Sequence, residues 1–226
     1  MLGVSSQEII RLPALPLDSD VIFISDFDGV DFATIAVDRS VKAAHMSFFG
    51  AAHLDVLIKK YGSASYSAGG GTSGIKLPVD PDYATLVNGD FTIDGYVYAP
   101  TAFNFNTIIA GVFANGANAA QSLWAFKITS DTLRFSVQGI GGSAQDYAIA
   151  LHGMLGGQFY YVAVCRCGPV IRIFVEGVMI AKAIFPVRSL LPNPTTIGLS
   201  IGCDWDLTNP YIIPDNINAM HITKKT

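Results

Sequence analysis

The chain has 226 residues, 50% hydrophobic and 14% charged, a length that suits one globular domain rather than several. Its formal charge of -4 excludes the basic surface that non-specific nucleic-acid binding requires, and no apolar stretch is long enough for a membrane-spanning helix. We therefore expect no nucleic-acid partner and no membrane insertion. Its 22 glycines, 11 prolines and 11% aromatic residues favour an all-β chain.

Residues 1–19 are predicted to form an extended arm, because prolines interrupt their apolar residues. Such an arm either docks on its own domain or latches onto a neighbouring subunit, and the sequence leaves both open. The second alternative makes an assembly contact of five residues: Leu12, Pro13, Leu15, Pro16 and Leu17. Residues 20–226 are predicted to form a single domain.

From residue 20 onward, short apolar or alternating segments recur between clusters of Gly, Asn, Asp and Pro, which is typical of a β-sandwich or barrel. The predicted strands are 21–27, 44–49, 91–98, 107–113, 123–128, 133–138, 145–151, 159–167, 170–175, 178–184, 195–199 and 217–223. Residues 51–61 are the best helical candidate, and we expect that helix to be short or absent.

Two segments predict local geometry. Leu133, Phe135 and Val137 should face the core, while Thr132, Arg134, Ser136 and Gln138 should face solvent. Residues 175–178 should form a tight hairpin, because Glu176-Gly177 supplies the two-residue turn between apolar strands. Residues 69–74 are rich in glycine and predict a loop.

Several segments resemble, in order, those of the laminin-G-like branch of the concanavalin A-like lectin/glucanase superfamily. They are 21–29 (VIFISDFDG), 61–66 (YGSASY), 89–97 (GDFTIDGYV), 158–166 (QFYYVAVCR), 171–178 (IRIFVEGV), 196–198 (TIG) and 217–223 (INAMHIT). Tyr96 and Phe159 stand where that family usually has Trp, Glu176 where Asn is common, and His221 where Arg is common. The resemblance implies a two-sheet antiparallel β-sandwich of the jelly-roll type, the class that the composition also predicts.

The sequence argues against an enzyme. Glucanases of that superfamily need two carboxylates close together, yet the chain has only Glu8 in the arm and Glu176 in the predicted hairpin turn. The odd count of three cysteines, with no signal peptide recognised, favours reduced thiols. Cys165 and Cys167 should share one strand face with Phe159, Tyr161 and Ala163, where we expect small buried thiols rather than a zinc site with Cys203.

No cofactor is predicted, although calcium is one alternative. Related lectin-like domains hold calcium through loop carboxylates, and four residues are candidates here: Asp28, Asp31, Asp204 and Asp206. The commoner role of such aspartates is to cap turns through neighbouring backbone amides.

A glycan- or partner-binding face would combine aromatic rings with polar groups. The candidates are Asp94, Tyr96, Tyr98, Arg134 and Arg172, provided that their strands share a sheet, together with Trp205 and Tyr211 in a later loop. The alternative for the two loop aromatics is simple packing within the loop.

Two functions fit these features. The first is a non-enzymatic structural protein of a tailed bacteriophage, either a capsid decoration protein or a tail accessory protein. It would be made in the host cytoplasm and located on the virion surface, with other virion proteins, copies of itself and host-surface glycans as partners. This hypothesis joins the family resemblance to the lack of a recognised export signal. The second is a carbohydrate-binding lectin or adhesion module of a bacterium.

Overall fold

The computed structural model describes residues 18–70, 73–101, 106–113, 122–138, 144–185, 198–203 and 216–225. The predicted arm lies almost wholly outside these residues, as do Trp205, Tyr211, Asp204 and Asp206. Within the described part, no helix is long and apolar enough to cross a membrane.

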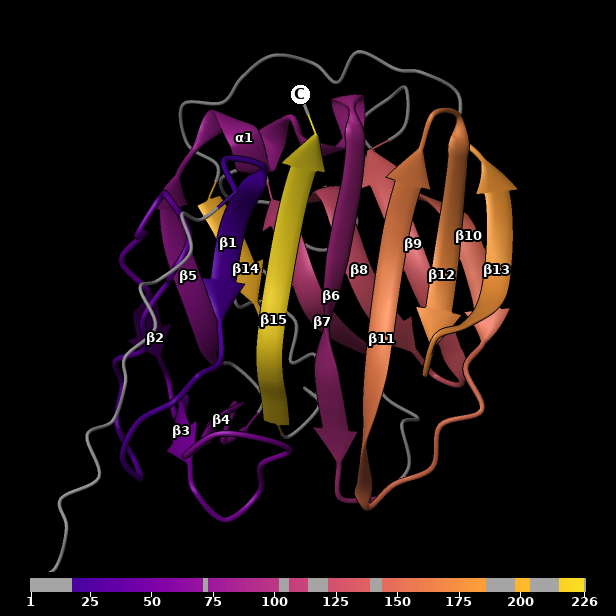
Figure 1. Ribbon diagram of the computed structural model, residues 1–226. Helices are drawn as coiled ribbons and strands as arrows, with labels where there is room; N and C mark the ends of the chain where they lie inside the picture. The colour runs from indigo at the N-terminus through magenta and orange to yellow at the C-terminus, as the bar shows by residue number, and fades with distance from the viewer. Residues whose placement is uncertain are drawn as a thin grey trace, which may run out of the picture.

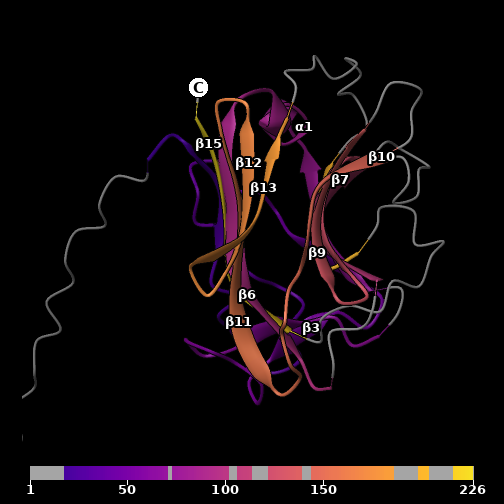
Figure 2. The same cartoon turned by 90° about the vertical axis from the view of Figure 1, so that its right-hand side faces the viewer.

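Two antiparallel sheets pack face to face, so the prediction of an all-β sandwich is confirmed (Figures 1 and 2). The sheet nearer the viewer in Figure 1, the front sheet, has β1 paired with β15 beside a path of seven strands. In order these are β13 (Val178–Ile184), β12 (Val170–Val175), β11 (Gln158–Cys167), β6 (Asp90–Ala99), β15 (Asn216–Lys225), β4 (Ser65–Ser67) and β3 (His53–Asp55), with β1 spanning Val21–Ser25.

The back sheet has seven strands among the described residues. Their order is β10 (Ala144–Leu151), β9 (Thr132–Gln138), β8 (Ser122–Thr129), β7 (Asn106–Phe113), β14 (Gly198–Ile201), β5 (Gly74–Val79) and β2 (Ser47–Phe49). Between β5 and β6, the short helix α1 (Pro81–Ala84) and the 3-10 turn η1 (Leu86–Asn88) lie at the upper end of the sandwich in Figure 1. Asp80 caps α1 by accepting a hydrogen bond from the Asp82 amide, and Pro81 begins the helix.

Aromatic side chains from both sheets meet in the core. The rings of Phe91 in β6 and Phe135 in β9 lie 5.3 Å apart, and Trp124 in β8 stacks at 6.4 Å from Phe135. The Trp124 indole N–H donates a hydrogen bond of 2.7 Å to the carbonyl oxygen of Tyr83, which ties α1 to the back sheet. The strands thus enclose one core, and this buried N–H helps to fix the helix against it.

Replacing Trp124 with phenylalanine should lower the free energy of unfolding by about 2 kcal/mol, because the buried Tyr83 carbonyl loses its donor and a small cavity remains. Urea unfolding of wild type and variant measures this loss. Ile184→Val, at an exposed position of β13, is the control and should stay within about 0.5 kcal/mol of wild type. A Trp124 variant as stable as that control would contradict the role assigned to the hydrogen bond.

The predicted hairpin at 175–178 is confirmed. β12 and β13 pair with Val175 opposite Val178, and the two turn residues Glu176 and Gly177 have φ of 49° and 76°. Both values lie in the left-handed region that a type I′ turn requires, which is why glycine stands at the second position.

Other local predictions need correction. Residues 51–61 contain β3 and no helix, and β4 and β5 were not predicted from sequence. Leu133, Phe135 and Val137 face the core as predicted. Ser136 was expected to face solvent but is fully buried, so the outer face of the back sheet is covered at that point.

Candidate functional site

The outer face of the front sheet carries half-buried side chains along its central strand. In β6, inward residues are buried and alternate with Thr92, Asp94, Tyr96 and Tyr98, which point outward and are partly exposed. This strict alternation follows from the period of two in a β-strand whose one face packs on a core. The prediction that Asp94, Tyr96 and Tyr98 lie on the outward face of their strand is therefore confirmed.

Aromatic rings from neighbouring elements join this row. Antiparallel pairing of β11 with β6 sets Tyr161 opposite Tyr96 and Phe159 opposite Tyr98, with ring centroids 5.2 and 5.1 Å apart. Tyr61, from the loop between β3 and β4, meets Tyr96 edge-on at 5.4 Å. Rings at such distances support one another. These five residues, Tyr61, Tyr96, Tyr98, Phe159 and Tyr161, are called the aromatic platform below.

Polar groups border the platform. Tyr161 lies close to the Asp94 carboxylate, and the Tyr161 amide donates to Glu176 Oε1 at 2.6 Å. The Lys60 ammonium lies 5.8 Å from the ring centre of Tyr96. A hydrogen bond with Tyr61 raises the pKa of Tyr96, and burial raises that of Tyr161, so both phenols stay protonated at neutral pH. The surface offers rings, hydroxyl donors, carboxylate acceptors and one ammonium group together.

His221 in β15 closes one side of this group. Its Nδ1 lies 3.2 Å from Oδ1 of Asp94, whose side chain is mostly buried. The hydrogen bond to Asp94 raises the pKa of His221 against the opposing effect of burial, and the charge of Asp26 raises it further while Arg39 lowers it. The imidazole is therefore charged over a wider pH range than a free histidine.

This pair predicts a pH dependence of stability. Because the folded-state pKa of His221 is raised, its contribution is complete below the unfolded value of about 6.5 and is lost as pH rises through the folded value. We expect less than about 1 kcal/mol, since the imidazole is partly exposed. Urea unfolding between pH 5 and 9 should show wild type losing stability, relative to His221→Gln, as pH rises. The exposed His45→Gln variant is the control, and a similar pH dependence for both variants would contradict the assignment.

One buried side chain positions the loop that carries Tyr61. The side-chain oxygen of Asn218 accepts hydrogen bonds from the backbone amides of Lys60 and Tyr61 at 2.9 and 2.7 Å. Its amide nitrogen donates to the carbonyl oxygens of Asp26 and Ala64 at 3.0 and 3.2 Å. Asn218 thereby holds two separate loops to β15, and it is fully satisfied within the protein.

A β-bulge aims Asn218 at these loops. The register between β15 and β6 shifts between Asn218 and His221, and Ala219 within this stretch has a φ of 52°. Opposite the bulge, a Cβ on Gly95 would lie 3.1 Å from the Ala219 carbonyl oxygen, closer than nearly all real Cβ contacts. Bulges commonly redirect a side chain in this way, and glycine leaves room for this one.

The remaining predicted site residues are dispersed. Arg172 in β12 lies on the front sheet, one strand beyond β11 and opposite Cys165. Arg134 lies in β9 of the back sheet, so the expectation that it shares a surface with Asp94, Tyr96 and Tyr98 is wrong. Trp205 and Tyr211 lie outside the described residues, as do the arm residues Leu12, Pro13, Leu15, Pro16 and Leu17.

Two of the four calcium candidates are described, and both bind backbone amides. Asp28 Oδ1 accepts from the Ser63 amide at 2.6 Å, and Asp31 Oδ1 accepts from the Val56 amide at 3.3 Å. These contacts join the turn after β1 to the loop between β3 and β4. Among the described residues, no group of three His, Cys, Asp or Glu side chains is arranged to hold a metal ion.

The thiols differ from the expectation of small buried groups. Cys203 is buried, Cys165 is half-buried and Cys167 is exposed, so the prediction is wrong for Cys167. The shared face with Phe159 and Tyr161 is as predicted, because β11 pairs with β6 from Gln158 to Arg166 without a register shift.

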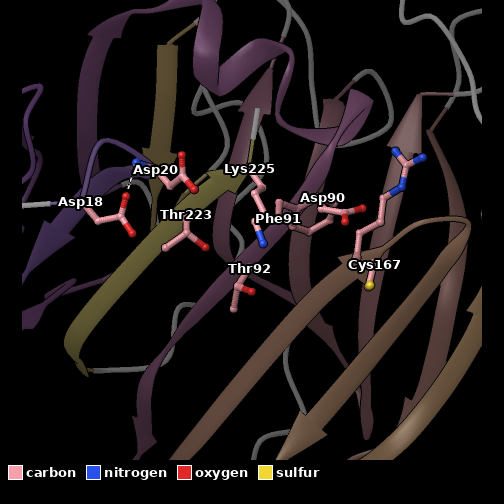
Figure 3. A pocket seen from close by; sticks show the side chains of 9 residues that line it. Asp18, Asp20, Asp90, Phe91, Thr92, Cys167, Thr223 and Lys225 are labelled. Atoms are coloured by element: carbon pink, nitrogen blue, oxygen red, sulfur yellow. Dashed lines mark hydrogen bonds between the residues drawn. The ribbon is translucent and has the colours of Figure 1, made fainter.

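A polar hollow of about 330 Å³ lies at the other end of the same face (Figure 3). Figure 3 shows Asp18 and Asp20 on one side of it, Cys167 on the other, and Thr223 and Thr92 between them. The lining comprises Asp18, Asp20, Asp90, Phe91, Thr92, Arg166, Cys167, Thr223 and Lys225. We call it the polar hollow. The Arg166 guanidinium is directed to backbone, donating to the carbonyl oxygens of Val87 and Gly168.

Comparison with known proteins identifies the fold. No family model matches the sequence, and no curated protein matches it. Among solved structures, the binding domain of botulinum neurotoxin serotype D superposes with a TM-score of 0.62 at 11% identity, covering 92% of this chain and 49% of that one. The sialidase of Trypanosoma rangeli superposes with a TM-score of 0.61 at 12% identity, covering 95% of this chain and 33% of that one.

A third similar structure contains a ligand. It is the binding domain of botulinum neurotoxin DC in complex with SialylT, with a TM-score of 0.60, 14% identity and coverage of 92% of this chain and 48% of that one. The chain thus spans about half the length of these neurotoxin domains. At such low identity the likeness defines the fold alone, which is a two-sheet antiparallel β-sandwich.

Proposed function

We propose that the protein is a non-catalytic carbohydrate-binding module, and that the aromatic platform is its binding surface. The observation that carries the proposal is the gathering of five aromatic rings from three elements on one partly exposed sheet face, beside Asp94, Glu176 and Lys60. Packing of the core does not require rings on an outer face, and their gathering there supports a binding role for that face.

The chemistry of the platform suits a sugar. The C–H groups on one face of a pyranose ring stack against the electron-rich face of an aromatic ring, while its hydroxyls need donors and acceptors at the border. Here the Tyr161–Asp94–His221 group supplies acceptors and donors, and Lys60 supplies an ammonium donor. The similar structures whose names describe binding domains, one of them in complex with SialylT, add support.

A glycan array tests this proposal. Fluorescently labelled wild-type protein should retain one or more glycan classes, and Tyr161→Ala should lose the same signals while its circular dichroism spectrum stays that of a folded β protein. A wild-type protein with no signal on neutral, acidic or branched glycans would overturn the proposal. Equal signals for wild type and variant would show that the binding surface lies elsewhere on the protein.

We further propose, from the sequence resemblance, that this module is a surface component of a tailed-bacteriophage particle. None of the similar structures named above is a virion protein. The test is incorporation: mass spectrometry of purified particles should detect the full-length chain, and a variant without residues 1–19 should be missing. Equal incorporation of both chains would show that the arm is not needed for assembly. Absence of both chains from particles would favour the alternative hypothesis of a bacterial lectin.

A further inference from the structure

We propose that the ligand is an extended neutral glycan chain, which lies along β6 with one sugar on the aromatic platform and another in the polar hollow. This inference rests on the proposed carbohydrate binding and deepens it, because it specifies how much of the chain is bound and what charge it carries. It predicts binding to the interior of a polysaccharide rather than to a single terminal sugar.

The strand register places both features on one continuous track. Thr92 of the polar hollow and Tyr96 of the aromatic platform are outward residues of the same strand, with only Asp94 between them on that face. From Asp90 to Tyr98 the strand covers about 27 Å at the usual rise per residue. A ligand that touches both ends must therefore be several sugar units long.

Between the platform and the hollow, no bulky side chain of the neighbouring strands β11 and β15 blocks this track. In the row between the platform and the hollow, β11 places Ala163 opposite Asp94, and the next outward residue of that strand is Cys165. On the other side, β15 places His221 opposite Asp94 and Thr223 opposite Thr92. Small side chains on one side and hydrogen-bonding groups on the other leave a path from ring to hollow.

The two ends of the track have complementary shapes and chemistry. The platform is an open stack of rings, which suits the apolar face of a sugar. The hollow is concave and, at about 330 Å³, has the liquid volume of about ten waters, which is ample for one sugar ring. Its threonine hydroxyls and carboxylates can bind sugar hydroxyls in place of those waters.

The charge of the hollow selects against acidic sugars. Three carboxylates line it, those of Asp18, Asp20 and Asp90, and Lys225 supplies one ammonium group. Arg166 is buried with its guanidinium bound to backbone carbonyls, so it is poorly placed to bind a ligand carboxylate. An anionic sugar would meet a net negative lining, and this repulsion favours a neutral one.

The test is a length series. Isothermal titration calorimetry with linear gluco-, manno-, xylo- and chito-oligosaccharides of one to six units should give, in at least one series, an affinity that rises at least about tenfold between two and five units. Thr92→Arg, which fills the hollow, should reduce the affinity for the five-unit ligand to about that for two units. Thr223→Arg reaches the same hollow from β15 and should act alike. Ile184→Arg adds the same side chain at an exposed edge of the front sheet and should have no effect.

The outcomes separate this inference from the proposal on which it rests. Affinity that is independent of length, long-chain binding unaffected by both arginine variants, or binding only to branched or acidic glycans on the array would overturn the extended neutral chain, while carbohydrate binding would stand. If no glycan of any class binds, both fail together.

Discussion

Replacing Tyr96 with alanine is expected to lower the affinity for the bound glycan at least about tenfold. Tyr96 is the centre of the aromatic platform, because its ring contacts both Tyr61 and Tyr161. Removing it deletes one stacking surface and loosens two others, and a loss of about 1.4 kcal/mol corresponds to a tenfold change in the dissociation constant. Titration calorimetry with the strongest ligand from the glycan array measures the change.

Two variants control this experiment. Tyr96→Phe keeps the ring and loses only the hydroxyl that is hydrogen-bonded to Tyr61, so its affinity should fall by a smaller factor. Phe32→Ala removes an exposed aromatic ring that stacks on His53 rather than on a ring of the platform, and it should leave affinity unchanged. If Tyr96→Ala binds as tightly as Phe32→Ala, the platform is not the binding surface.

Replacing Asn218 with alanine should lower the free energy of unfolding by about 3 kcal/mol. Four hydrogen bonds are lost at a buried position, and backbone groups of two loops are left without these partners. The same change should weaken glycan binding, because the loop amides of Lys60 and Tyr61 lose the acceptor that fixes them beside Tyr96. Urea unfolding and calorimetry on the same preparation measure both effects.

Asn218→Asp separates the two halves of this role. An aspartate keeps an acceptor for the Lys60 and Tyr61 amides but offers no donor to the carbonyls of Asp26 and Ala64. Its stability should be no higher than that of Asn218→Ala, because the buried carboxylate would face the carbonyl oxygens of Asp26 and Ala64. Its glycan affinity should stay nearer to wild type than that of Asn218→Ala. A loss of less than about 1 kcal/mol for the alanine variant would show that water replaces these bonds without cost.

The long strands could be predicted from sequence because alternation marks them. β6 and β12 each show an unbroken period of two, and the Glu176-Gly177 turn fixes the hairpin that follows β12. β3 and β4 have three residues each, too few for a period to emerge, and β5 begins within the glycine-rich segment. The apolar residues of 51–61 have a spacing that would suit a helix, but part of this segment forms β3, which pairs with β4.

Of the candidate site, only the residues that lie on the same strand could be predicted together from sequence. Alternation alone places Asp94, Tyr96 and Tyr98 on one face. It could not assign Arg134 to the back sheet, since sheet membership depends on topology rather than on local pattern. Tyr61 was missed because a side chain far along the sequence, Asn218, holds its loop in place.

The central place of β15 has a consequence for how the chain folds. β1 pairs only with β15 among the described strands, with Val21 opposite Thr223, and β4 also joins the front sheet through β15. The first and last described strands must therefore meet before the front sheet is complete. Such distant pairings slow folding, and the edges of β1 and β4 stay open for association with other chains in the meantime. Refolding yield should therefore fall as protein concentration rises, and slow dilution at low concentration should favour the native sandwich.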